Sequence, residues 1–212
     1  MNTKTVVTEV AAVGTLIGSY PLDWLAGKVE PYLCAPASEP VILLHGLGGS
    51  RSNLFALAAY LRLAGFDNVS YFEYPRWQSI GDSAGELGHV VEEKIAEKGG
   101  APGVHLIGHS LGGTVARRYS AGARRNAVRT LITLGSPYSY GQWSPREVAI
   151  FGEDDPIVPA PIETLVTRAT FSRIVTLSDV GHLALIFHPE VLRIVGTELR
   201  ANRSVEAAGA AA

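Results

Sequence analysis

A serine between glycines is the clearest chemical signal in this sequence. It stands in GHSLG, residues 108–112, directly after an apolar run at 104–107 and before a segment with helical spacing. In this G-x-S-x-G context the serine sits on a sharp turn from strand to helix, which exposes its hydroxyl. The N–H groups at the start of that helix then point towards negative charge that develops nearby. The pattern predicts that Ser110 is a nucleophile.

A serine hydroxyl is a weak nucleophile and needs a neighbouring base that a carboxylate orients. After such a turn the expected order along the chain is serine, then acid, then histidine. Two histidines follow Ser110, and His182 lies in a loop after a predicted strand, from where it can reach back over the sheet edge. His188 stands beside Pro189 at the start of the last predicted helix and fits a cap or a surface residue better. We predict that His182 is the base.

Three acidic residues compete for the role of the carboxylate. Glu153, Asp154 and Asp155 all follow the strand predicted at 147–151, so position alone does not separate them. Asp155 precedes Pro-Ile-Val-Pro, whose apolar groups would pack behind it and fix its direction. We therefore favour Asp155 and keep Asp154 and Glu153 as alternatives.

The oxyanion hole is built from backbone N–H groups, which the sequence identifies only by their place. One donor follows the nucleophile and the other comes from an earlier strand–helix loop. These positions predict Leu111 and, from the glycine-rich segment HGLGG at 45–49, Leu47. Together with Leu47 and Leu111, the apolar side chains of Ile157 and Leu183 would suit an acyl chain at the rim of the site, or equally the edge of the core.

These residues require a fold that brings them together. Short apolar runs bounded by turn residues predict six strands, which alternate with stretches of helical spacing. Repeated strand–helix units with apolar strands are typical of a mainly parallel sheet covered by helices on both faces. The predicted fold class is therefore α/β. The strands are expected at 40–44, 69–72, 104–107, 129–134, 147–151 and 173–177, and the helices at 6–25, 53–64, 83–98, 111–121 and 189–199.

The composition indicates one domain and argues against several classes of protein. The chain has 212 residues and a formal charge of −2, which gives no electrostatic reason to expect a nucleic-acid partner. Its single cysteine, Cys34, has no internal disulfide partner, and its six histidines lack the Cys/His spacing of a structural zinc site. No stretch of about 18 uncharged apolar residues appears, so we expect no transmembrane segment.

The two ends of the chain are expected to differ from a catalytic domain at 40–200. Residues 1–39 are predicted to form an N-terminal extension packed on that domain, and residues 201–212 a low-complexity tail. The first thirty residues do not have the basic start and apolar run of a secretory signal, because Thr8 and Glu9 interrupt it. A cytoplasmic location is therefore expected, with secretion as the alternative.

Four segments in combination resemble the α/β-hydrolase superfamily. They are VILLHGLGG at 41–49, LIGHSLGG at 106–113, TLGSP at 133–137 and VGHL at 180–183. Within the superfamily the sequence looks most like small bacterial lipases and esterases of the class 2 lipase type. The resemblance implies that Ser110, Asp155 and His182 are nucleophile, acid and base, with Leu47 and Leu111 at the oxyanion hole. It implies neither a metal nor an organic cofactor.

The resemblance also implies a minimal version of the fold. Many members insert a cap domain where this chain has only residues 135–146, which are too few for one. We therefore expect an open active site, with Tyr138, Tyr140 and Trp143 either at its rim or packed in the loop.

The function implied by the resemblance is hydrolysis of carboxylic esters through an acyl-enzyme, on a small-molecule or lipid substrate. A thioesterase or an acyltransferase would use the same three residues. A binding protein that kept the fold without the activity is the more distant alternative. The sequence leaves the acyl chain length and the oligomeric state open.

Overall fold

A computed structural model describes residues 3–19, 39–97, 103–122, 125–138, 147–161 and 173–209 of the chain. Its centre is a six-stranded sheet with the order β2-β1-β3-β4-β5-β6, and every pair of neighbouring strands is parallel. All six strands lie within two residues of the predicted positions, so the predicted α/β class is confirmed. They are β1 (Val41–Leu44), β2 (Val69–Phe72), β3 (Val104–His109), β4 (Val128–Leu134), β5 (Glu147–Gly152) and β6 (Arg173–Leu177).

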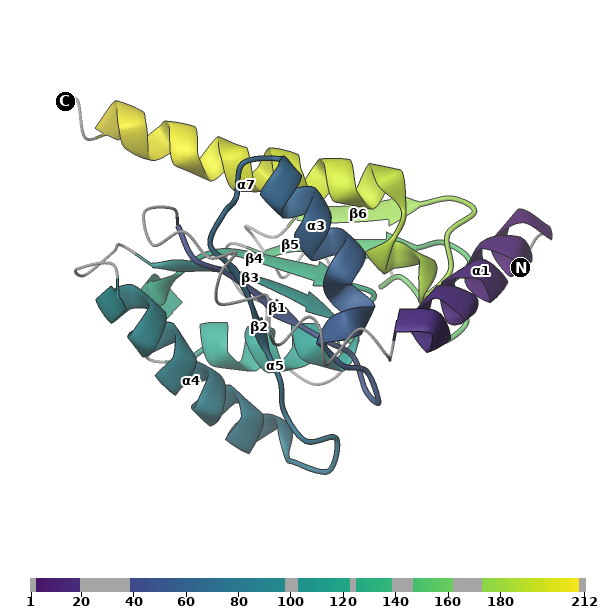
Figure 1. Cartoon of the computed structure of the whole chain (residues 1–212), viewed down its shortest axis with the longest axis horizontal. Coiled ribbons are helices and arrows are strands. Elements are labelled where there is room, and N and C mark those ends of the chain that lie inside the picture. Colours follow the sequence, from purple (N-terminus) through teal and green to yellow (C-terminus); the bar gives the residue numbers. More distant parts are fainter. Residues whose placement is uncertain are drawn as a thin grey trace.

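Helices cover both faces of this sheet (Figure 1). One face carries α3 and α7, and the other carries α4 and α5. A further helix, α1, lies at the end of the sheet to which the strand arrows point, beside η4. The α-helices are α1 (Thr3–Ser19), α3 (Phe55–Leu63), α4 (Ile80–Glu97), α5 (Leu111–Ser120) and α7 (Pro189–Gly209); the short 3-10 helices are η2 (Arg51–Leu54), η3 (Arg125–Ala127) and η4 (Ala184–Ile186).

Three helix boundaries differ from the sequence predictions, two of them for local reasons. Helix α4 begins at Ile80 instead of residue 83, because the Ser79 hydroxyl accepts a hydrogen bond from the N–H of Asp82 and so caps an earlier turn. Helix α7 continues to Gly209 instead of ending at 199, since the following segment is rich in alanine, arginine and glutamate, which favour helix. Helix α1 begins at Thr3, and its predicted end at residue 25 lies outside the described residues.

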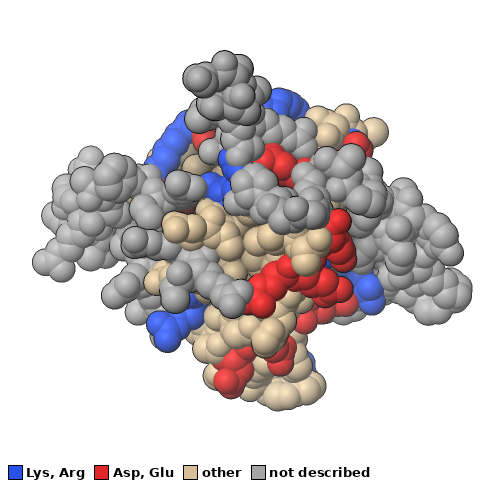
Figure 2. Space-filling view, turned by 90° about the vertical axis from the view of Figure 1, so that its left-hand side faces the viewer, with Lys and Arg blue, Asp and Glu red and all other residues tan. Residues whose placement is uncertain are grey.

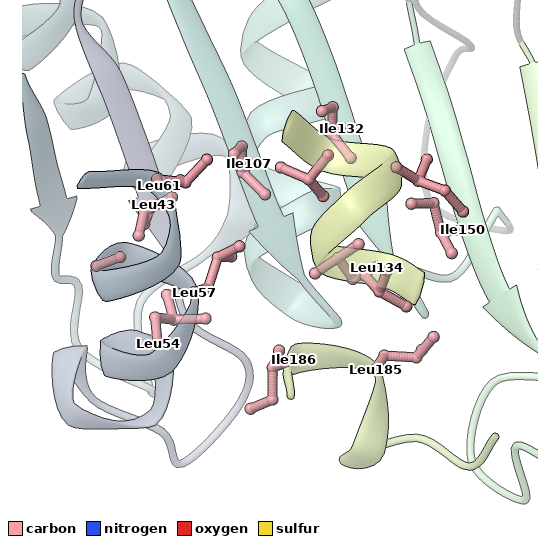
Figure 3. Packing of buried hydrophobic residues seen from close by; sticks show 14 of the residues in the cluster. Leu43, Leu54, Leu57, Leu61, Ile107, Ile132, Leu134, Ile150, Leu185 and Ile186 are labelled. Atoms are coloured by element: carbon pink, nitrogen blue, oxygen red, sulfur yellow. The ribbon is translucent and has the colours of Figure 1, made fainter. Parts of the chain in front are cut away.

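The apolar core lies in two layers, one on each side of the sheet. In β1 the alternate side chains Val41 and Leu43 face the layer under α3 and α7, while Ile42 and Leu44 face the layer under α4 and α5. All four are fully buried, as expected of a parallel strand covered on both faces. Figure 3 shows the first layer, in which side chains of α3 and of η4 meet those of the central strands.

The chain direction places the predicted chemistry at one edge of the sheet. From β1 the chain moves outward to β2, and it then crosses back to β3 on the other side of β1. The carboxyl ends of β1 and β3 therefore flank a topological switch point, which is where open α/β sheets bind their ligands. The glycine-rich segment at 45–49 follows β1, and Ser110 follows β3 directly.

A buried ion pair fixes α5 to the sheet. Arg117 of α5 donates through Nε and Nη2 to the carboxylate of Glu147 at the start of β5, at 2.7–3.2 Å, and both side chains are fully buried. The remaining nitrogen, Nη1, donates to the carbonyl of Pro137. Glu147 also accepts hydrogen bonds from the hydroxyls of Thr133 and Tyr138. All three guanidinium nitrogens and both carboxylate oxygens therefore have hydrogen-bond partners, which compensates for the burial of the two charges.

The end of the molecule at which the strands begin lies opposite the carboxyl edge of the sheet and carries charges of both signs (Figure 2). Acidic side chains gather across the middle of this face, and basic ones lie around them, in line with the small formal charge of −2. Across the ranges that the structure describes, no helix has both the length and the hydropathy that crossing a membrane requires.

Candidate active site

The backbone of Ser110 has the conformation of a strained turn. Its φ is 52° and its ψ is −119°; among the described residues, Asp179 is the only other non-glycine with positive φ. Its N–H donates to the carbonyl of Leu134 in the neighbouring strand β4, at 2.8 Å. Strain of this kind costs about 1–3 kcal/mol and gathers at functional sites. Ser110 thus stands between β3 and α5 in the turn that the G-x-S-x-G pattern predicts.

The glycines around Ser110 are required by close backbone contacts. A Cβ on Gly108 would lie 2.4 Å from the nitrogen of Gly113, and one on Gly112 would lie 2.5 Å from the carbonyl oxygens of Leu44 and His45. Both distances are far inside van der Waals contact. The missing side chain of Gly108 therefore lets β3 turn directly into α5, and that of Gly112 lets α5 begin against the end of β1.

His182 and Asp155 form a buried pair at the carboxyl edge of the sheet. His182 Nδ1 lies 2.7 Å from Asp155 Oδ2, and the two residues are only 3% and 6% exposed. A carboxylate can only accept, so Nδ1 carries the proton and the neutral ring has its lone pair on Nε2. The other carboxylate oxygen, Oδ1, accepts from the N–H groups of Ile157 and Val158, both at 2.8 Å. The Pro-Ile-Val-Pro segment thus fixes the direction of Asp155, through its backbone.

The two alternative acids point elsewhere. Glu153 Oε2 accepts a hydrogen bond from the hydroxyl of Ser178 at 2.6 Å, on the surface. Asp154 Oδ2 accepts one from the hydroxyl of Thr5 in α1, also at 2.6 Å. Of the three candidates, Asp155 is the one whose carboxylate contacts His182.

His109 supports His182 from the side of β3. Its Nε2 lies 3.1 Å from the carbonyl oxygen of His182, and because a carbonyl only accepts, this nitrogen is the donor. The two rings lie 4.8 Å apart. Burial, with the neighbouring His182 as the second cause, lowers the pKa of His109 to about 3, so the ring stays neutral in the folded protein at ordinary pH. The contact with His182 joins residues 73 positions apart, so the sequence around His109 does not indicate this role.

A pocket of about 320 Å³ opens over the serine and the histidine. The predicted rim residues Leu47 and Ile157 are 69% and 64% exposed, and Leu183 lies in the wall. The floor is continuous with the apolar core, since Leu54 and Ile186 belong to both (Figure 3). The pocket is lined by Gly46, Leu47, Gly48, Gly49, Asn53, Leu54, His109, Ser110, Ile157, His182, Leu183 and Ile186.

The fourth apolar residue that the sequence offered, Leu111, lies on the other side of the 46–49 loop. It lines a neighbouring pocket with Leu47, Tyr74 and Trp77, and so does not contribute to the wall around Ser110. Its backbone N–H follows Ser110 at the start of α5.

Of the three aromatic residues that the sequence placed either at the rim or in the loop packing after β4, the structure describes Tyr138. Tyr138 packs against Phe151 and under Arg117, and its hydroxyl donates to Glu147, so it is a packing residue away from the pocket. The other two aromatic residues considered for the rim, Tyr140 and Trp143, lie outside the described residues.

Helix α1 supplies a contact that the sequence gave no means of finding. Glu9 accepts hydrogen bonds from the N–H groups of Leu183 and Ala184, at 3.1 and 2.8 Å. Because 174 residues separate the first pair of partners, no local pattern indicates the contact. Within the described part of the chain, no group of three or more His, Cys, Asp or Glu side chains is placed to hold a metal ion.

Solved structures with the same arrangement are α/β hydrolases. A carboxylesterase from the thaumarchaeon Nitrososphaera gargenis is 14% identical with a TM-score of 0.67, and the match covers 81% of this chain and 93% of that one. A bacterial membrane phospholipase A is 16% identical, with a TM-score of 0.65 over 93% and 97% of the two chains. A serine hydrolase without a lid from Xanthomonas campestris is 23% identical, with a TM-score of 0.58 over 80% and 84%. The fold is therefore that of the α/β hydrolases, lid-less members included.

The family within that class follows from the sequence. The model of the palmitoyl protein thioesterase family matches residues 40–178, more than half of the chain. The chain belongs to this family. The matched segment includes Ser110 and Asp155 and ends before His182.

Proposed function

We propose that the protein hydrolyses carboxylic esters of small-molecule or lipid substrates through an acyl-enzyme, with Ser110, Asp155 and His182 as nucleophile, acid and base. The observation that carries the proposal is the pair of His182 and Asp155. The pair leaves Nε2 of the imidazole unprotonated, and its histidine lines the same pocket as the strained Ser110. A serine, a base and a carboxylate that orients it constitute the machinery of acyl transfer.

The proposed reaction proceeds in two halves. His182 Nε2 removes the proton from Ser110 as its oxygen attacks the substrate carbonyl, and the N–H groups of Leu47 and Leu111 stabilise the resulting oxyanion. The imidazolium then gives its proton to the leaving oxygen, and the alcohol departs. Water repeats the sequence on the acyl-serine and releases the carboxylic acid.

The first step requires a hydrogen bond between the Ser110 hydroxyl and His182 Nε2. In the described structure neither the Ser110 hydroxyl nor His182 Nε2 makes a hydrogen bond. Catalytic hydrogen bonds are often long in the free enzyme and tighten when substrate is bound.

Hydrolysis of acyl thioesters is the second candidate, and the family match favours it. The acyl half of the two reactions is identical, since both pass through the same acyl-serine. They differ in the leaving atom, because a thiol is a better leaving group than an alcohol and needs less help from His182. At about 320 Å³, the pocket is near the lower end of the roughly 300–1,000 Å³ of small-molecule sites, which favours short or medium acyl chains.

Turnover of p-nitrophenyl esters from acetate to palmitate, run beside acyl thioesters of the same chain lengths, tests the proposal. Ser110→Ala should abolish turnover and labelling by a fluorophosphonate together, whereas Ser178→Ala, a surface serine, should leave both intact. The larger kcat/KM between matched ester and thioester decides the substrate class. Turnover that survives in Ser110→Ala would refute the acyl-enzyme.

A further inference from the structure

Helix α1 packs against both loops that carry the candidate acid and base. Figure 1 shows it at the carboxyl edge of the sheet, beside η4. Thr5 is fully buried and donates to Asp154, the neighbour of Asp155. Ala12, two turns further along, is buried as well. The contacts of α1 thus begin next to the acid.

Between these two residues, Glu9 reaches the loop of the base. Its Oε2 accepts from the N–H of Leu183 at 3.1 Å, and its Oε1 accepts from the N–H of Ala184 at 2.8 Å. On the other side of His182, a Cβ on Gly181 would lie 2.5 Å from Cγ of Glu9. The carboxylate therefore binds the two residues after His182 and packs on the one before it.

The backbone of His182 is then held from two directions. His109 donates to its carbonyl oxygen at 3.1 Å, and Glu9 binds the next two N–H groups. The ring is held separately by Asp155. Without Glu9, the N–H groups of Leu183 and Ala184 lose their carboxylate acceptors, and the backbone of His182 keeps the hydrogen bond from His109.

We propose that Glu9 is a positioning residue for His182, acting through the N–H groups of Leu183 and Ala184. This inference rests on the proposed function, in which His182 Nε2 must meet the Ser110 hydroxyl. Catalytic groups depend on surrounding contacts that lock their geometry, and displacements near 1 Å are enough to slow turnover strongly. Helix α1 accordingly supports the proposed active site through Glu9.

Steady-state kinetics on Glu9 variants tests the proposal. Glu9→Ala should lower kcat about 10- to 100-fold and change KM by less than about twofold, since the acyl pocket is left in place. Glu9→Gln keeps one acceptor oxygen and should fall between the alanine variant and the wild type. Thr15→Ala, which removes only an exposed hydrogen bond to Ala11 on the same helix, is the matched control and should behave as wild type.

A double-mutant cycle separates positioning from general stabilisation. If Glu9 acts through His182, Glu9→Ala should cost little further kcat in an Asp155→Asn background, where the ring has already lost its orientation. If the loss of kcat in the double variant equals the product of the losses in the two single variants, the proposal is wrong. If the alanine variant is not recovered folded, Glu9→Gln carries the same test: lower kcat at unchanged KM supports positioning, and unchanged kcat overturns it.

The outcome also distinguishes this inference from the function on which it rests. Loss of turnover in Ser110→Ala together with wild-type kcat in Glu9→Ala would refute the role of Glu9 alone. Turnover that persists in Ser110→Ala would refute the proposed function itself.

Discussion

Among the described residues, the buried pairs Arg117–Glu147 and Asp155–His182 are built in opposite ways. Arg117 and Glu147 join α5 to β5, and both are enclosed by hydrogen bonds from protein groups. Asp155 and His182 stand at the carboxyl edge of the sheet, where the carboxylate has three hydrogen-bond donors but the imidazole keeps one nitrogen towards the pocket. The first pair has no group left for a ligand. The second presents one atom that can still take a proton.

The difference shows how a buried charge serves structure in one place and chemistry in another. A saturated ion pair holds two elements together, and removal of one partner leaves an uncompensated charge in the core. A histidine that is fixed through Nδ1 alone can exchange a proton at Nε2 without moving. Substitutions in the first pair should therefore change stability, and substitutions in the second should change turnover.

The largest expected effect is on turnover. Asp155→Asn should lower kcat about 10⁴-fold, because an amide donor beside Nδ1 favours the wrong tautomer of His182. Its carbonyl oxygen can still accept from Ile157 and Val158, so the thermal midpoint should change little. Ester hydrolysis and thermal unfolding measure the two quantities, with the surface variant Glu153→Gln as the control. A large fall in the thermal midpoint without loss of kcat would mean that the Asp155–His182 pair serves stability, as the Arg117–Glu147 pair does.

The next effect is on stability. Glu147→Gln should lower the free energy of unfolding by about 3–5 kcal/mol, because the guanidinium of Arg117 loses its counter-charge inside the core. Urea unfolding followed by circular dichroism measures this loss, and kcat of the folded enzyme should stay at the wild-type value. Glu190→Gln breaks an exposed pair with Arg193 and serves as the control, with no measurable change of midpoint expected. Wild-type stability in Glu147→Gln would contradict the role given to the saturated pair.

A pH-dependent effect comes from the histidine that supports His182. The pKa of His109 is lowered to about 3, so below pH 6.5 the unfolded chain binds a proton that the folded one does not. Stability is therefore lost as the pH falls, by about 2 kcal/mol between pH 7.5 and pH 5 from this group. His109→Gln, whose amide can still donate to the carbonyl of His182, should flatten this slope in urea unfolding. The exposed His89→Gln should keep it, and equal slopes in both variants would exclude His109 as the cause.

The smallest expected effect is at the rim of the pocket. Ile157→Ala should lower kcat/KM for octanoate relative to acetate by about 10-fold, since a few methylenes of contact are worth about 1–3 kcal/mol. Ile157 is well exposed in the free protein, so its stability should be unaffected. Leu63→Ala, which is 90% exposed on α3 and away from the pocket, is the control. An equal loss of kcat/KM for both esters would show that the acyl chain does not contact Ile157.

The sheet could be predicted from the sequence because each strand is recognised from residues that are adjacent in the chain. A buried parallel strand such as β1 is a short apolar run, and the partly buried edge strand β6 still carries Ile174, Val175 and Leu177 within five residues. The turn at Ser110 was equally visible, since the positive φ and the contacts of Gly108 and Gly112 require a fixed pattern of residues. The choice of Asp155 over its two neighbours was also made from adjacent residues, those of the segment that follows it.

The remaining features depend on contacts between distant segments. Tyr138 could not be separated from a rim residue, because its position depends on Glu147, nine residues further along the chain and on another strand. The lowered pKa of His109 arises from burial and from His182, neither of which its own neighbours in the sequence reveal. Glu9 counted in the sequence only as a charge that interrupts an apolar segment. Its partners lie near the other end of the chain.

The hydrogen bonds between Glu9 and the N–H groups of Leu183 and Ala184 can form only late in the synthesis of the chain. Translation proceeds at about 5–20 residues per second, so the 174 residues between Glu9 and Leu183 correspond to about 9–35 s. Glu9 must wait through that interval before its amide partners exist. Helix α1 is therefore made well before the loop that it binds, and these hydrogen bonds can form only after Leu183 and Ala184 have been added to the chain.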